Sequence, residues 1–303
     1  MRASLLAVTA VLLAAPAASQ QQDYSKVEIK VEQVAPGVAV LFGAGGNIGV
    51  SYGPDGNVLI DDQFAPLVPK IIAAVKGIDP DPVSFLINTH WHGDHTGGNE
   101  ALGSAGTVIV AQDNVRKRLA VDTVSKRYGY TAKALGKAGL PVITFTREIS
   151  FHLNGDTLQV VHVPRAHTDG DSLIYWTGAN VLHMGDTFFH KETYPFIDRD
   201  SGGSIDGMIA AAKRGLALVK PGGRAIPGHG PVATRAELQA YHDMLVDVRG
   251  KVAAGIRAGR SRAQVIASKP TAVYASTIAS DGFIKPDNFV GGIYDDLKAV
   301  PRR

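Results

Sequence analysis

The chain has 303 residues, of which 45% are hydrophobic and 19% are charged, and its formal net charge is +3. This composition is that of an ordinary globular protein with enough length to bury a large core. The basic residues are spread thinly and form no stripe with interleaved aromatics, so we expect no nucleic-acid partner. The absence of cysteine excludes disulfides, and it removes thiolates from the possible metal ligands and nucleophiles.

The first residues have the form of a secretory signal peptide. A basic start at Arg2 is followed by a short apolar run over 5–15 and by small residues around a break at Pro16. That run is too short to span a bilayer. We therefore expect a signal peptide over 1–19 and a secreted or periplasmic single domain over 20–303, without stable membrane association after leader cleavage.

The first half of the mature chain predicts antiparallel strands followed by an alternation of strands and helices. Alternating and apolar runs predict strands over 27–34, 38–42, 47–52, 57–60, 83–88 and 107–111. Helices are expected from Pro66 or Pro69 to Lys76, and after Gln112. The Gly-rich turn 43–47 is a candidate flap over a site. The polar stretch 128–139 is interpreted as an insertion or an exposed connection.

The second half repeats this alternation. Strands are predicted over 157–163, 172–177, 181–184 and 224–226, and a helix over 204–219. Further helices are expected to begin at Thr234, where Glu237 completes a capping box, and at Ser261, where Gln264 stands three residues on. One domain built from two related β-then-α halves is the simplest interpretation.

Four potential metal ligands lie within one run of six residues, His-Trp-His-Gly-Asp-His, directly after the strand over 83–88. Packing does not require such a cluster, whereas imidazole and carboxylate are ligand types that zinc takes. The run contains His90, His92, Asp94 and His95. We interpret it as a metal-binding loop.

One loop cannot hold two ions, so further ligands are expected at the ends of later strands. Three later strands are each followed by a histidine or an aspartate flanked by glycine or small residues, which let an ion approach the backbone closely. These residues are His167, Asp186 and His229.

The pattern His-x-His-x-Asp-His, then a lone His, then Gly-Asp, then Gly-His-Gly, resembles the metallo-β-lactamase-fold hydrolase superfamily. The resemblance implies an α/β (α+β) fold, a four-layer αββα sandwich, with two zinc ions (iron being the alternative metal) at one edge between the sheets. It assigns His90, His92 and His167 to the first zinc, and Asp94, His95 and His229 to the second.

Two acidic positions complete the site that the resemblance implies. Asp186 stands where secreted β-lactamases carry a cysteine ligand, and it matches the glyoxalase II branch, in which aspartate bridges both metals. Asp61 follows the strand over 57–60 and is expected to orient a ligand imidazole, the alternative being a turn former at the strand end.

The resemblance further implies that metal-bound hydroxide, held in line by Asp94, attacks a carbonyl of a small-molecule substrate. β-Lactamase activity, the hydrolysis of the ring amide, is the leading expectation. The alternatives are a lactonase or esterase, a thioesterase with glyoxalase II-like chemistry, and a non-enzymatic metal-binding or di-iron redox module. Candidate substrate-binding residues are Trp91, Phe189, His190 and Lys191. Phe189 replaces the substrate-binding lysine of the cysteine-ligand β-lactamases, for which Lys191 is a candidate substitute. The oligomeric state stays open.

Overall fold

A computed structural model describes residues 23–299, so the expected signal peptide over 1–19 lies outside the described residues. Within 23–299, no helix has both the length and the apolar character needed to cross a membrane. The assignment of 20–303 to one domain stays a prediction.

The first sheet has seven strands, and its strands follow one another in chain order. They are β1 (Lys30–Ala35), β2 (Val38–Phe42), β3 (Ile48–Ser51), β4 (Asn57–Ile60), β5 (Val83–Asn88), β6 (Val108–Gln112) and β9 (Ile143–Phe145). The strands β1 to β4 pair antiparallel, whereas β4, β5, β6 and β9 pair in parallel. Parallel neighbours need long crossovers, and helices α1 (Val68–Ile78) and α3 (Asn99–Ser104) supply the first two.

The second sheet has six strands, also in chain order. They are β10 (Glu148–Leu153), β11 (Asp156–His162), β12 (Ser172–Trp176), β13 (Val181–His183), β14 (Arg224–Ile226) and β15 (Ala233–Thr234). The pair β13 and β14 is parallel and is connected through α5 (Ile205–Leu218), while the other pairs are antiparallel. The parallel pair matters for the site, because its two carboxyl ends lie at the same edge of the sheet.

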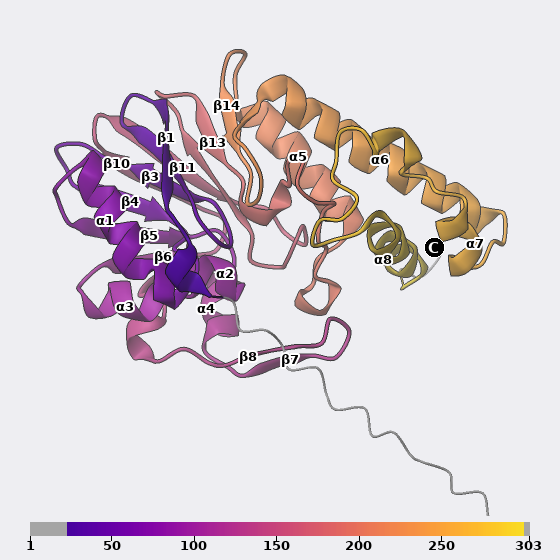
Figure 1. Ribbon diagram of the computed structural model, residues 1–303, viewed down its shortest axis with the longest axis horizontal. Coiled ribbons are helices and arrows are strands. Elements are labelled where there is room, and N and C mark those ends of the chain that lie inside the picture. The colour runs from indigo at the N-terminus through magenta and orange to yellow at the C-terminus, as the bar shows by residue number, and fades with distance from the viewer. Residues whose placement is uncertain (1–22, 300–303) are drawn as a thin grey trace, which may run out of the picture.

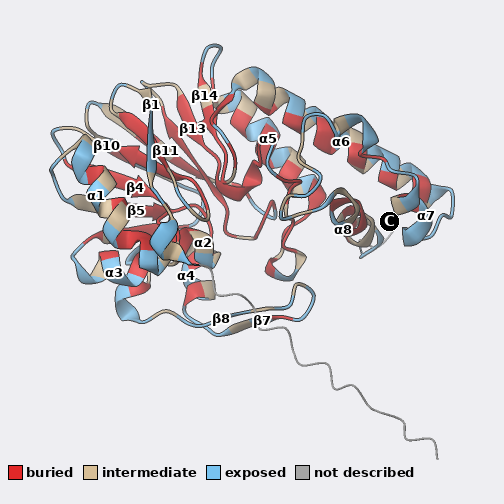
Figure 2. Cartoon of the chain, in the orientation of Figure 1, coloured by how far each residue is buried: buried red, intermediate tan, exposed pale blue. Residues whose placement is uncertain are grey.

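The alternation of side chains along the strands builds the layers. On β2, Val38 and Val40 pack between the two sheets, while Ala39 and Leu41 face the helix layer on the outside of the first sheet. The strand β2 is apolar on both faces because the other sheet covers one face and the helices cover the other. Figure 2 shows the buried residues concentrated on the strands and on the inner faces of the helices.

Helices cover the outer face of each sheet (Figure 1). The outer face of the first sheet packs against α1 and α3. The outer face of the second sheet packs against α5 and α6 (Arg235–Arg257), and α7 (Arg262–Ala267) and α8 (Pro286–Ala299) pack in turn against α6. The predicted four-layer αββα sandwich is thus confirmed. The capping box predicted at Thr234 is present, and at the predicted helix start Ser261 forms a second one with Gln264.

The remaining elements are short. They are α2 (Gly93–Thr96), α4 (Asp113–Leu119), the hairpin of β7 (Thr123–Ser125) and β8 (Tyr130–Ala132), and six short 3-10 helices (Tyr24–Lys26, Ala65–Leu67, Lys137–Gly139, Gly185–Thr187, Arg199–Ser201 and Ala272–Tyr274). The β7–β8 hairpin falls where the sequence predicts an exposed connection over 128–139, and it begins five residues earlier.

Candidate metal centre

Strand ends of both sheets deliver the predicted ligands to one edge of the sandwich. The strand β5 leads into the loop of His90, and the parallel strands β13 and β14 lead to Asp186 and His229. A hydrogen bond from the Gly228 amide to the Gly185 carbonyl, 2.7 Å long, ties these last two loops together.

The structure brings all seven predicted ligands together in two adjacent groups. Within each group, one ligand atom per residue lies within 4.8 Å of every other. The first group is His90, His92, His167 and Asp186, and the second is Asp94, His95 and His229. The grouping follows the division between two ions that the resemblance implies.

Asp186 lies between the two groups. Its Oδ1 is 3.1 Å from His95 Nε2 and 3.4 Å from His229 Nε2, and its Oδ2 is 3.5 Å from His167 Nε2. One carboxylate oxygen therefore faces each group. This is the arrangement required of a carboxylate that bridges two cations.

Several ligand atoms are buried without a hydrogen-bond partner. Whether a cation could supply the missing partner shows whether these residues fit a metal ion. His90 Nε2, His95 Nε2 and Asp186 Oδ1 are buried and form no hydrogen bond of good geometry, although the last two atoms lie 3.1 Å apart. An unsatisfied buried polar atom costs about 1–3 kcal/mol, so folded proteins seldom retain one without a reason. Divalent cations with nitrogen and oxygen ligands would satisfy all three atoms, so the donor set fits.

The protonation state of the first group suits metal binding. Burial, helped by the neighbouring histidines, lowers the pKa of His90 well below its usual value. Burial likewise lowers the pKa of His167 to about 4. Both imidazoles are therefore neutral at pH 7, and a neutral imidazole is the form that binds a metal ion.

Hydrogen bonds at the far nitrogen orient four of the ligand imidazoles, as in known metal sites. The partners are Thr89 Oγ1 for His90 (3.0 Å), Asp198 Oδ2 for His92 (2.9 Å), Asp61 Oδ2 for His95 (2.7 Å) and the Phe196 carbonyl for His167 (2.7 Å). When these bonds hold the ring protons, the unprotonated His92 Nδ1 and His167 Nε2 face each other 2.9 Å apart. A cation bound by both lone pairs would remove their repulsion.

Asp61 supports both groups of ligands. Its Oδ2 accepts from His95 Nδ1 and from the hydroxyl of Thr89, which in turn lies against His90. Its Oδ1 accepts from the Thr89 amide at 2.7 Å. Asp61 is fully buried and its φ of 65° lies in the left-handed region, where aspartate is tolerated better than most residues. The structure thus places Asp61 where an imidazole-orienting residue should be.

Asp198 was not predicted from the sequence, although it contacts a ligand directly. It is fully buried, and its Oδ2 accepts from His92, from Tyr130 Oη (3.0 Å) and from Ser201 Oγ (2.6 Å). Its Oδ1 caps the 3-10 helix at Arg199–Ser201. The hydrogen bonds from His92 and Ser201 outweigh the opposing effect of burial and lower the pKa of Asp198, which keeps the acceptor ionised.

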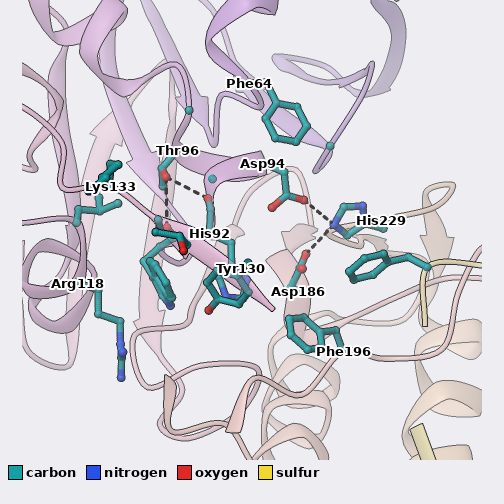
Figure 3. A pocket seen from close by; sticks show the side chains of 18 of the residues that line it. Phe64, His92, Asp94, Thr96, Arg118, Tyr130, Lys133, Asp186, Phe196 and His229 are labelled. Carbon is teal, nitrogen blue, oxygen red and sulfur yellow. Dashed lines mark hydrogen bonds and ion pairs between the residues drawn. The ribbon is translucent and has the colours of Figure 1, made fainter. Parts of the chain in front are cut away.

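Four of the candidate ligands line a pocket of about 660 Å³ (Figure 3). Asp94, Asp186 and His229 line it, together with Trp91 and Phe189 from the predicted substrate-binding set. The pocket lies within the size range of small-molecule binding sites.

The other two predicted substrate-binding residues lie outside this pocket. The buried His190 hydrogen-bonds through Nδ1 to the Pro231 carbonyl at 2.8 Å, and Lys191 Nζ pairs with Glu237 at 2.8 Å. Phe189, which precedes them in the chain, stacks on His229 with ring centroids 5.5 Å apart. The structure places neither His190 nor Lys191 in the lining of this pocket, and their contact with a substrate stays a prediction.

The Gly-rich turn 43–47 is tied to the site and does not hang over it as a free flap. The Gly46 amide donates to the Asp94 carbonyl at 3.0 Å, and the Asn47 amide donates to the Gly228 carbonyl at 2.7 Å. A Cβ on Gly46 would overlap the His95 ring. Glycine is needed here for close approach to a ligand imidazole.

A two-sheet sandwich with a two-part His/Asp metal site at its edge is the architecture of a class of metal-dependent hydrolases. The family model described as the metallo-beta-lactamase superfamily matches residues 41–238. The chain belongs to the metallo-β-lactamase superfamily.

Solved structures show the same fold at low sequence identity. A metallo-β-lactamase from Pontibacter korlensis is 18% identical with a TM-score of 0.59, and the match covers 73% of this chain and 100% of that one. The DIM-1 metallo-β-lactamase is 16% identical with a TM-score of 0.57, covering 73% and 98%. A stereoselective inverting sec-alkylsulfatase from Pseudomonas sp. is 15% identical with a TM-score of 0.67, covering 91% of this chain and 52% of that one.

Proposed function

We propose that this protein is an exported di-zinc hydrolase that cleaves a carbonyl ester or amide bond, the β-lactam ring amide among them. The observation that supports this function is the pair of ligand groups that share Asp186 at the floor of an open pocket. Imidazole and carboxylate ligands favour zinc, with iron as the alternative metal. Export would follow from the expected signal peptide over 1–19, and N-terminal sequencing of the mature protein would test it.

Two bound divalent cations would supply a water of lowered pKa and polarise the scissile carbonyl. Asp94 would position that water. Its side chain is 27% exposed, so it reaches the pocket while its Oδ2 lies 3.3 Å from His229 Nε2. Burial opposes ionisation of Asp94, but His95 and His229 outweigh it and lower its pKa. The ionised carboxylate accepts a hydrogen bond from the attacking water and aims its oxygen at the carbonyl carbon.

The residues that line the pocket affect which substrates are preferred. Lys191, the candidate for recognising a substrate carboxylate, is held by Glu237 outside the pocket. β-Lactam hydrolysis is therefore expected with a high KM. Lactones, aryl esters and thioesters share the same carbonyl chemistry without requiring a carboxylate.

The test combines metal analysis with a substrate panel on the mature protein. We expect two zinc ions per chain and turnover of at least one of a chromogenic cephalosporin, a lactone, an aryl ester and a thioester. A secondary alkyl sulfate, the substrate type named for one structural neighbour, tests whether the bond cleaved is a sulfate ester instead. Hydrolysis of none of the carbonyl substrates by the zinc-loaded protein would exclude the function.

Two variants separate the site from the scaffold. His92→Ala should lower the zinc content, whereas His152→Ala, which removes an exposed histidine on β10, should not. Equal zinc content in the two variants would mean that the metal binds elsewhere.

A further inference from the structure

The pocket above the metal cluster is largely walled by apolar and aromatic side chains. Figure 3 shows Phe64 on one side of Asp94 and His229, and Tyr130 and Phe196 on the other. The rest of the wall includes Trp91, Leu119, Ala132, Leu135, Phe189 and Phe283. Such a wall stabilises a ligand chiefly by removing its apolar surface from water.

Both of the Lys and Arg side chains among the described residues that line the pocket already have carboxylate partners. Arg118 makes two hydrogen bonds of 2.7 Å to Asp169, and Lys133 Nζ lies 2.6 Å from Asp122. Arg118 also lies over the Trp91 ring, 5.8 Å from its centroid. Among the described residues, the pocket therefore offers a negatively charged substrate no lysine or arginine side chain that is not already paired.

One wall is held in place without a ligand. The β7–β8 hairpin docks on residues 197–201 through side-chain hydrogen bonds of 2.8–3.0 Å, so the wall that it forms is built before any substrate arrives. The donors are Ser125, Arg127, Tyr128 and Tyr130.

An aromatic path leads from the metal cluster to the rim of the pocket. Phe196 stacks on the His92 imidazole with centroids 5.9 Å apart, and it meets Phe283 edge-on at 6.1 Å. Phe283 lines the pocket and yet is 80% exposed. A phenyl ring left in water at the end of such a path is placed to contact a ligand that reaches out of the pocket.

The segment that carries Phe283 lies beyond residues 41–238, which match the superfamily model. It is fastened to the chain a few residues after the ligand Asp186. The Ala279 amide donates to the Lys191 carbonyl at 2.7 Å, and the Ile284 amide donates to the Thr193 hydroxyl at 2.8 Å. These bonds fix the position of Phe283 at the rim.

From these contacts we propose that the pocket binds the apolar acyl group of a neutral ester or lactone, and that the group lies along Phe196 and Phe283. This substrate class rests on the proposed hydrolase function. The carbonyl would face Asp94 and His229, and the acyl group would run toward the rim. Hydrolysis adds the water oxygen to the carbonyl carbon, breaks the carbon–oxygen ester bond and passes a proton to the leaving alcohol.

The test measures kcat/KM of the zinc-loaded protein on 4-nitrophenyl acetate, butyrate and octanoate. Each methylene buried by the pocket can raise kcat/KM by up to about fourfold. We expect octanoate to exceed acetate by at least about tenfold. Phe283→Ala should lower the octanoate-to-acetate ratio by about fivefold, and Phe283→Leu should retain most of it. The matched control is Val273→Ala, which removes an exposed apolar side chain of the same C-terminal region that does not line the pocket.

A binding measurement separates this substrate class from the hydrolase function. Trp91 lines the pocket, while the other tryptophan of the chain, Trp176, is buried between the sheets, so the fluorescence of Trp91 reports on ligands. Octanamide should bind more tightly to the parent than to the Phe283→Ala variant. Acetamide should bind to both proteins with the same affinity. If the esters are hydrolysed with no preference for octanoate, or with the same preference in Phe283→Ala, the acyl site is refuted while the hydrolase function stands. If octanamide shows the Phe283 effect but no carbonyl substrate is turned over, the site stands as a binding site and the hydrolase function fails.

Discussion

Replacing Asp198 by asparagine tests how the protein sets the ligand geometry. The Oδ2 atom of Asp198 accepts three hydrogen bonds, one of them from His92 Nε2, and Oδ1 accepts from the backbone amides of residues 200 and 201 at 3.1 Å. An asparagine has a single oxygen. If that oxygen serves the backbone amides, its NH2 group must face His92, Tyr130 and Ser201, all of which donate in the parent.

The imidazole of His92 can meet this change only by moving its proton. With the proton on Nδ1, Nε2 can accept from the new amide, but Nδ1 then no longer has a lone pair for a metal ion. Loss of such a supporting partner lowers metal affinity by about 10–100-fold in known sites. This corresponds to about 1.4–2.8 kcal/mol of binding free energy. We expect a loss of this size for one of the two ions, because His92 belongs to one ligand group only.

The assay is a zinc titration against a competing chelator that resolves the two binding steps. Asp200→Asn is the matched control, because it makes the same charge change two residues away on a carboxylate that pairs with Arg127 and not with a ligand. Tyr130→Phe, which removes one donor from Asp198, should give a smaller loss. Two binding steps of unchanged affinity in Asp198→Asn would refute the reasoning.

Four further predictions follow from the geometry. Asp94→Ala should keep the circular dichroism spectrum and lower kcat by about 10²–10⁴-fold; turnover at the parental rate would rule out its role. Gly228→Ala should weaken zinc binding, since its Cβ would overlap Asp186 Oδ1, whereas Gly77→Ala meets nothing within 4 Å and should stabilise α1 by up to about 1 kcal/mol in urea unfolding. Removing zinc with a chelator should lower Tm by several degrees, and restoring zinc should reverse it. Thr234→Ala should cost about 1 kcal/mol of unfolding free energy through the lost capping box of α6, without changing zinc content.

The layers could be predicted from the sequence because their signals are local. The strand over 83–88 was predicted with the bounds that β5 has, and apolar alternation located most of the others. The strand β10 was missed because its side chains are mostly exposed or half-buried, which leaves little hydrophobic pattern. The helix α8 was missed because it contains Gly291 and Gly292, which lower helix propensity. Its stability comes from packing against α6 and α7, which no local pattern records.

The candidate metal ligands could be predicted because their signals are also local in the sequence. The residues that hydrogen-bond to the ligand imidazoles could not all be predicted in this way. Four ligands lie within six residues, and the other three each follow a strand. Asp198 reaches His92 across 106 positions of chain, and in sequence it has the form of an ordinary helix cap followed by Ser201. The position of His190 and Lys191 outside the pocket has the same origin, because it depends on their contacts with Pro231 and Glu237, which lie 41 and 46 positions further along the chain. Proximity in sequence to Asp186 does not show which of the neighbouring side chains line the pocket.

Metal binding is also expected to affect the stability of the fold. Three buried ligand atoms without partners would cost about 1–3 kcal/mol each, against a total stability of about 5–15 kcal/mol for a typical protein. The ligands come from both sheets: His90 follows β5 of the first, and Asp186 and His229 follow β13 and β14 of the second. A cation bound there would stabilise the association of the two sheets at their open edge, where apolar packing ends. The unpaired ligand atoms that would bind the cations would thus also make the stability of this edge of the sandwich depend on the metal.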